Sequence, residues 1–146
     1  MIDRATVTIR GATDADAPRI AALLTDEGYP AGASDIADRL GRFSSEFSQV
    51  RVAAQAGEVL GFVAVHVLPR FEHGDRIVRI VAMVVDPGVR ERGLGHLLMQ
   101  EAERIGRETG AAFIEVTAGH HRPDARRLYE AIGYETGVTT YLRKRL

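Results

Sequence analysis

The residues best suited to chemistry lie in one stretch, residues 84–98, which reads VVDPGVRERGLGHLL. An apolar run ends there in a short turn, and Arg90-x-x-Gly93-x-Gly95 then opens an amphipathic segment. Glycines at a helix start let unpaired main-chain N–H groups approach an anion, and arginines add fixed positive charge. The pattern predicts a cradle for a phosphate or pyrophosphate. The alternative is a tight strand-to-helix turn that binds nothing.

Two other phosphate-binding loops do not fit this stretch. A Walker loop requires GxxxxGK[ST], and residues 84–98 contain no lysine. A dinucleotide fingerprint follows the first strand of a βαβ unit, whereas this loop follows a strand in the middle of the chain. The loop therefore belongs to another kind of anion site, if it binds a ligand.

Hydrophobic periodicity predicts the elements that position this loop. Helices are expected at residues 13–27, 34–43, 94–109 and 124–132, with a Thr13–Asp16 capping box and Gly110 as a C-cap. Strands are expected at residues 7–10, 49–54, 59–68, 76–85, 113–117 and 139–146. The order β-α-α-β-β-β-α-β-α-β predicts one mixed α/β (α+β) domain over residues 1–146.

The strand at residues 76–85 is apolar on both faces apart from Arg79, which is typical of a central strand covered on both sides. Strict alternation places Val81 and Met83 on one face and Val78 and Ala82 on the other. A buried Arg79 requires a partner, and Glu115 on the following strand is the candidate.

Composition limits the classes of function. The chain has 146 residues, 45% of them hydrophobic, and a formal net charge of -1, so neither nucleic acid nor an anionic membrane is the expected partner. It has no cysteine, which excludes disulfides, thiolate zinc sites and a cysteine nucleophile. No apolar run reaches the length of a signal peptide or membrane span, so we expect a cytoplasmic protein. The adjacent His120 and His121 lack a third ligand, so no metal is expected.

The strand, V-D-P turn, R-x-x-G-x-G and amphipathic helix together resemble the acetyl-CoA-binding motif of the GNAT superfamily. Ala125-x-x-Leu128-Tyr129-Glu130-x-x-Gly133-Tyr134 is similar to that family's second signature, and IRGATDADAPRIAALL to its first strand and helix. The resemblance implies a GNAT-like fold and an N-acetyltransferase that moves an acetyl group from acetyl-CoA to a primary amine. It also implies direct attack, without a covalent enzyme intermediate.

The resemblance assigns roles to particular residues. Tyr129 takes the position of the general acid that protonates the departing CoA thiolate, and a phenol of pKa ~10 suits that task. A core aromatic with no catalytic role is the alternative for Tyr129. The implied cofactor-binding residues, first along the central strand and then along the loop, are Met83, Val84, Val85, Arg90, Glu91, Arg92, Gly93, Leu94, Gly95 and His96.

The chain departs from the family pattern in three places. In many relatives a glutamate on the central strand serves as the general base, often through a water molecule. Here positions 79, 81 and 82 are Arg, Val and Ala. Arg122 stands where an asparagine is usual. Glu91 replaces a small residue in the loop. The candidates for the missing base are Glu115, His73 and the neighbouring Glu72.

The acceptor is not identified by the sequence. Arg79 either forms a structural ion pair or binds an acceptor carboxylate, and Glu27, Tyr29 and Pro30 could line the acceptor entrance. A small-molecule or peptide amine is expected, and relatives commonly form homodimers. The second hypothesis is an acyl-CoA-binding sensor or partner module with weak or no turnover.

Overall fold

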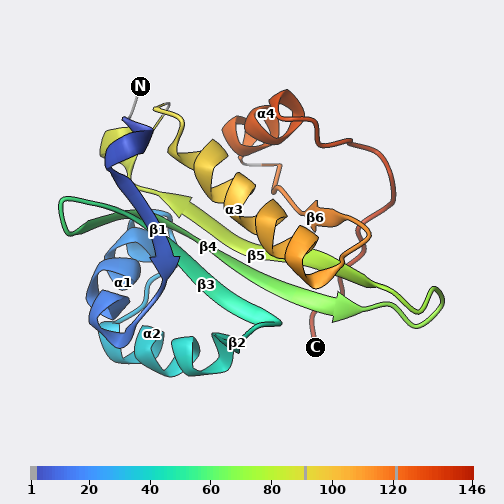
Figure 1. The fold of residues 1–146 in the computed structure, drawn as a ribbon, viewed down its shortest axis with the longest axis horizontal. Coiled ribbons are helices and arrows are strands. Elements are labelled where there is room, and N and C mark those ends of the chain that lie inside the picture. The colour runs from blue at the N-terminus through green and yellow to red at the C-terminus, as the bar shows by residue number, and fades with distance from the viewer. Residues whose placement is uncertain (1–2, 91, 121) are drawn as a thin grey trace.

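The computed structural model describes residues 3–90, 92–120 and 122–146 (Figure 1). Its strands are β1 (Val7–Gly11), β2 (Ser44–Ser45), β3 (Ser48–Gln55), β4 (Glu58–Pro69), β5 (Arg76–Val85) and β6 (Ile114–Val116). Its α-helices are α1 (Ala17–Asp26), α2 (Ala33–Leu40), α3 (Leu94–Thr109) and α4 (Pro123–Ala131), with 3-10 turns including η3 (Gly41–Phe43) and η4 (Pro87–Val89).

The strands form one mixed sheet in the order β1-β3-β4-β5-β6, with β2 paired to β3. All neighbours are antiparallel except β5 and β6, which are parallel and are joined through α3. In Figure 1, α3 and α4 lie on one side of the sheet and α1 and α2 on the other. The expected mixed α/β architecture is confirmed.

Two apolar clusters hold these layers together, one on each face of the sheet. The first joins α3 to the sheet through fully buried side chains such as Leu98 and Met99. The second joins α1 and α2 to the sheet around Leu23, Ile36 and Phe62. β4 and β5 therefore lie in the middle of the core, as the apolar run at residues 76–85 indicated.

A β-bulge interrupts β5 at Val81. Val65 pairs with Ile80 while Ala64 pairs with Ala82, so Val81 has no partner on β4. The bulge reverses the alternation, because Met83 packs with Val78 and Ile80 in the α3 cluster. The expected face assignment, with Met83 opposite Val78, is wrong because one extra residue shifts every later side chain to the other face.

The last expected strand, residues 139–146, does not form; the described segment from Thr139 to the end contains no strand. Its apolar side chains bury little surface, with Tyr141 59% and Leu142 84% exposed. β6 is only three residues long and offers a short ladder, and Arg143-Lys144-Arg145 breaks the apolar alternation that would hold a strand on the sheet. The prediction failed because strand propensity needs a partner edge and a buried face.

The expected start of the first helix is confirmed. Asp16 Oδ2 accepts a hydrogen bond from the main-chain N–H of Thr13 at 2.8 Å, which closes the capping box. Arg10 contacts the same carboxylate at 2.7 Å and holds the pKa of Asp16 below its usual value. The turn between β1 and α1 is thereby tied to β1.

A buried carboxylate links α3 to the far strands of the sheet. The side chain of Glu101 is 7% exposed; Arg51 Nε on β3 donates to it at 2.8 Å and Arg104 Nε at 2.5 Å. Burial raises the pKa of Glu101, but the hydrogen bonds from Arg104 and Arg51 outweigh it and leave the pKa lowered. The ionised form is thus the one that the fold stabilises.

Glu101→Gln should lower the free energy of unfolding at pH 7 by about 1–3 kcal/mol, because charged hydrogen bonds to a buried group are lost. A carboxyl group whose pKa is lower in the folded than in the unfolded state stabilises the fold at pH values above its unfolded pKa. This stabilisation is lost as the pH falls through the folded-state pKa. The difference between wild type and variant should therefore shrink below about pH 4 in urea titrations. Glu108→Gln is the matched control: Glu108 also pairs with Arg104 but is 65% exposed, so its cost should stay below about 0.5 kcal/mol. Equal costs would contradict the assignment.

Candidate functional site

The second half of β5 has an open edge, residues 81–85. The β5–β6 ladder pairs Val78, Arg79 and Ile80 with β6 and then ends, and no described strand continues it. Asp86 N–H donates to Leu60 on β4 at 2.8 Å, so the alternating main chain directs Met83 and Val85 toward the open side. An extended ligand could pair with this edge as an added strand.

The turn after β5 is held by one carboxylate. Asp86 Oδ1 accepts from Gly88 N–H at 2.7 Å and caps η4. Arg19 of α1 also contacts Asp86, and these two interactions, the main-chain bond first, lower the pKa of Asp86. The turn is therefore fixed against both β5 and α1.

Gly93 directs the chain into α3. It has φ +88°, a left-handed conformation that favours glycine, and Leu97 N–H donates to its carbonyl at 3.1 Å. The N–H groups of Leu94 and Gly95 precede the first acceptor of the helix, so they have no intrahelical partner. The first turn of α3 has no acidic residue, and Arg90 and Arg92 precede it. An anion placed here would share Arg90 with the carboxylate of Glu27; Glu91 lies outside the described residues.

Two tyrosines at α4 differ in their hydroxyl groups. The hydroxyl of Tyr134 donates to Glu103 Oε2 at 2.9 Å, while that of Tyr129 has no hydrogen-bond partner among the described residues. Tyr129 is only 9% exposed, and no enclosed polar atom of the described side chains lacks a partner, so its oxygen reaches the surface. Burial raises the pKa of Tyr129, and the nearby charge of Arg122 opposes that rise.

Glu27 joins three separate segments at this place. Its side chain is 7% exposed and contacts Arg90 of the loop and Arg122, whose Nη1 lies 3.0 Å from Oε2. The end of α1, the loop after β5 and the start of α4 are therefore connected by one carboxylate. The sequence suggested Glu27 only as a lining residue, and its contacts with arginines 63 and 95 positions later had no sequence signal.

Other expected site residues lie outside the open edge at residues 81–85. Arg79 and Glu115 form the expected ion pair at 3.0 Å, but both side chains are only partly buried, with 36% and 37% exposed, so Arg79 is less buried than expected. That part of the sheet extends beyond the cover of α1 and α2. His73 is exposed in the β4–β5 turn, at the opposite end of β5 from the loop, and Tyr29 is 54% exposed after α1.

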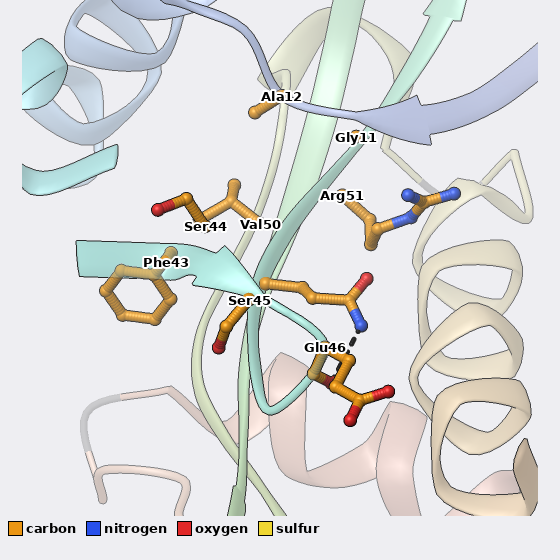
Figure 2. Close-up of a pocket in the computed structure, with 9 residues that line it drawn as sticks. Gly11, Ala12, Phe43, Ser44, Ser45, Glu46, Val50 and Arg51 are labelled. Carbon is orange, nitrogen blue, oxygen red and sulfur yellow. Dashed lines mark hydrogen bonds between the residues drawn. The ribbon is translucent and has the colours of Figure 1, made fainter. Parts of the chain in front are cut away.

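A hollow of about 390 Å³ lies elsewhere, between the end of β1, η3, β2 and the start of β3 (Figure 2). It is two strands away from the open edge of β5. In Figure 2, Arg51 points away from it toward α3, and Gln49 is tied to the main chain of Glu46 at 3.0 Å. The anion cradle and the hollow are thus separate features.

Two kinds of feature are absent from the described ranges, a cluster of metal ligands and a membrane-crossing helix. No group of three or more His, Asp or Glu side chains there is arranged to hold a metal ion. None of the described helices has both the length and the apolar character that crossing a membrane requires.

Comparison with known proteins decides the family. The model of the acetyltransferase (GNAT) family matches residues 17–134, which include the loop, α3 and α4. The chain belongs to the GNAT acetyltransferase family. The resemblance of the loop and of the α4 segment to GNAT signatures is therefore confirmed.

Similar proteins agree with this family. An uncharacterized N-acetyltransferase, YhfO, of Bacillus subtilis is 31% identical over 144 residues, covering 92% of this chain and 95% of its own. An aminoalkylphosphonate N-acetyltransferase of Salmonella typhimurium is 34% identical over 85 residues, covering 58% of this chain and 55% of its own, about half the length of that relative. A solved structure described as a transcriptional regulator of Bacillus halodurans has a TM-score of 0.88 at 23% identity, covering 96% and 99% of the two chains, which shows the fold alone.

Gly95, the second glycine of the GNAT loop, makes room for α4. A Cβ at Gly95 would lie 2.9 Å from Leu128 Cδ2 and 3.8 Å from Met83 Cε. Its place is inside α3, so a side chain there would force Leu128 of α4 to move. This glycine thereby sets the position of Tyr129, the neighbour of Leu128.

Gly95→Ala should cost about 1–3 kcal/mol of stability, because the new methyl group overpacks against Leu128. The same change in a Leu128→Ala background should cost less than about 0.5 kcal/mol, since the clash is gone. Gly41→Ala is the control: a Cβ there meets nothing within 4 Å, so stability should hold or rise slightly. Additive effects in the Gly95/Leu128 cycle, measured by chemical denaturation, would contradict this packing.

Proposed function

We propose that this GNAT protein is an N-acetyltransferase that moves the acetyl group of acetyl-CoA to a primary amine of a small acceptor. The observation that carries the proposal is the open edge of β5, which runs into the start of α3, together with Tyr129 on α4, whose hydroxyl has no hydrogen-bond partner in the part of the chain that the structure describes. GNAT acetyltransferases use acetyl-CoA as donor, and the residues present here fit its two halves.

The two halves of acetyl-CoA meet different groups of this chain. The main chain of Met83 and Val85 offers hydrogen bonds to the amide-rich pantetheine arm. The N–H groups from Gly93 to Gly95 and the side chains of Arg90 and Arg92 suit a pyrophosphate. Holding the thioester between these groups and the acceptor amine would supply most of the rate enhancement. Glu91, outside the described residues, stays a predicted loop contact.

Transfer proceeds by direct attack. The neutral amine attacks the thioester carbonyl carbon, a C–N bond forms, and the C–S bond breaks. Main-chain N–H groups at the open edge would stabilise the developing oxyanion. Tyr129 is protonated at neutral pH because burial raises its pKa, and it donates its proton to the leaving thiolate. The nearby positive charge of Arg122 then stabilises the tyrosinate.

The proposed acceptor is a small primary amine that also carries an anionic group. The Salmonella relative is named for aminoalkylphosphonates, which have both groups. Arg79 and Tyr29, on the side of the sheet that faces α1 and α2, are the proposed acceptor contacts. Glu115 is occupied by Arg79 at 3.0 Å, and His73 stands at the other end of β5, so the mechanism assigns the base to neither.

The sensor hypothesis has no support from the relatives, two of which are named N-acetyltransferases. A module that only binds acyl-CoA would have no need for an unengaged phenol beside the thioester. The accessible hydroxyl of Tyr129 therefore favours the enzyme.

Thermal unfolding with acetyl-CoA, CoA and ATP tests the donor site without a guess about the acceptor. At about 100 times the dissociation constant, one ligand adds roughly 2.7 kcal/mol and raises the midpoint by roughly 5–11 °C. Acetyl-CoA and CoA should give this shift, and ATP much less, because ATP lacks the arm that pairs with β5. No shift with acetyl-CoA would overturn the proposed function. An equal shift with ATP would indicate a general nucleotide-phosphate site.

Tyr129→Phe should lower kcat by about 10²-fold and leave the acetyl-CoA dissociation constant unchanged, because only proton donation is removed. Tyr134→Phe is the matched control, since it deletes a hydroxyl one turn away that is bonded to Glu103 at 2.9 Å. That variant should lose about 0.5–1.5 kcal/mol of stability and keep its turnover. Thiol release from acetyl-CoA is measured with 2-aminoethylphosphonate, an α-amino acid, a diamine and an aminoglycoside. Equal loss of turnover in both variants would rule out Tyr129 as the specific donor.

A further inference from the structure

The proposed transfer needs a group that removes a proton from the acceptor. A primary amine is mainly an ammonium ion at neutral pH and cannot attack until one proton leaves. β5 provides no carboxylate near its bulge, and Glu115 is paired with Arg79. The inference below rests on the proposed function and concerns this missing base.

His66 on β4 lies beside the bulge. It is the Cα partner of Arg79, and the bulged residue Val81 falls between the partners of Ala64 and Val65. Strand alternation puts His66 on the face of Ala64, toward α1 and α2, away from α3. Val81 itself is 46% exposed, whereas Ala64 is 6% exposed and Ala82 packs against the α1–α2 cluster, so the bulge is the exposed point of this otherwise covered part of β5.

The imidazole of His66 is held in one orientation by two neighbours. Its Nδ1 lies 2.9 Å from Ser48 Oγ on β3. Its ring stacks on Phe43 of η3, with ring centroids 4.7 Å apart and an interplanar angle of 24°. No described residue forms a hydrogen bond with Nε2. An imidazole held at Nδ1 and open at Nε2 has the arrangement of a general base positioned by a second group.

Two charged side chains on the strands beside His66 form an ion pair with each other. Arg79 on β5 is its cross-strand neighbour, and Glu115 on β6 neutralises Arg79 at 3.0 Å. Ser48 and Phe43, from β3 and η3, are uncharged. Glu115 therefore offsets the positive charge that Arg79 places beside His66.

We propose that His66 is the base of the reaction and takes a proton from the acceptor ammonium at Nε2, directly or through one water. The juxtaposition of His66, Ser48 and Phe43 with the bulge carries this proposal. The acceptor would enter from the α1–α2 side of the sheet while Tyr129 stands on the α3–α4 side. Both would meet at the gap where the β5–β6 ladder ends.

The protons balance over one turnover. His66 takes the first proton of the ammonium and later releases it to solvent. The amine attacks, the C–N bond forms and the C–S bond breaks. Tyr129 gives its proton to the sulfur, and the second proton lost by nitrogen returns the tyrosinate to the phenol. The net products are the amide, free thiol and one proton.

The test compares His66→Gln with wild type over pH, using the best acceptor of the amine panel. The pH profile of kcat/KM should show a rising limb in the wild type that is absent from the variant. The variant should be about 10²-fold slower at pH 7 and should approach wild type at high pH, where the amine is already neutral. Its acetyl-CoA thermal shift should stay unchanged, because the donor binds the other face. A variant that keeps the limb and the wild-type rate would overturn the proposal.

Two further variants separate catalysis from structure. Ser48→Ala should lower kcat/KM less than His66→Gln and displace the limb without removing it, because the ring stays but loses its anchor. His73→Gln tests the rival histidine: loss of the limb there, with the limb intact in His66→Gln, assigns the base to His73 and overturns the proposal. Absence of thiol release by wild type with every amine would overturn the proposed function as well. Turnover by wild type with an intact limb in His66→Gln would overturn only the role of His66.

Discussion

The structure depends on β5 pairing fully with one neighbour and only partly with the other. β4 pairs with β5 along the whole length of β5, apart from the bulge. β6 pairs with only three residues of β5, the last of which is Ile80, next to the bulge. Main-chain groups of a central strand are almost always satisfied within the sheet, so an open edge in mid-sheet is costly without a partner. The apolar clusters on both faces of the sheet stabilise it and offset the cost of this open edge. The bulge also decides which residues face that edge.

Ion pairs placed around the opening hold its walls in position. Asp86 ties the loop to Arg19 on α1, and Glu27 ties the other end of α1 to Arg90 and Arg122. The start of α4, and with it Tyr129, is thereby linked to the acceptor-side helices. Removing Glu27 would affect segments from both faces of the sheet, because it connects the end of α1 with the start of α4.

In the proposed mechanism, the two faces of the sheet provide different chemical groups at the same opening. Tyr129, on the α3–α4 side, has a phenol that burial keeps protonated, whereas His66 on the other side has an imidazole with an open nitrogen. An acid and a base on opposite sides of one gap can act on the leaving group and on the attacking amine without neutralising each other. This separation follows from the sheet standing between them.

Local signals in the sequence were sufficient for most elements and for the loop. The Thr13–Asp16 capping box, the left-handed Gly93 and the apolar run of β5 all act through neighbours in the chain, so periodicity and residue type predicted them. The family also followed from two local motifs. Three features needed the tertiary structure: the bulge at Val81, the bridge from Glu27 to two arginines, and the absence of a strand at residues 139–146. Each depends on a partner far away in the chain, through strand register, ion pairing or a free sheet edge, and local residue patterns contain no record of such partners.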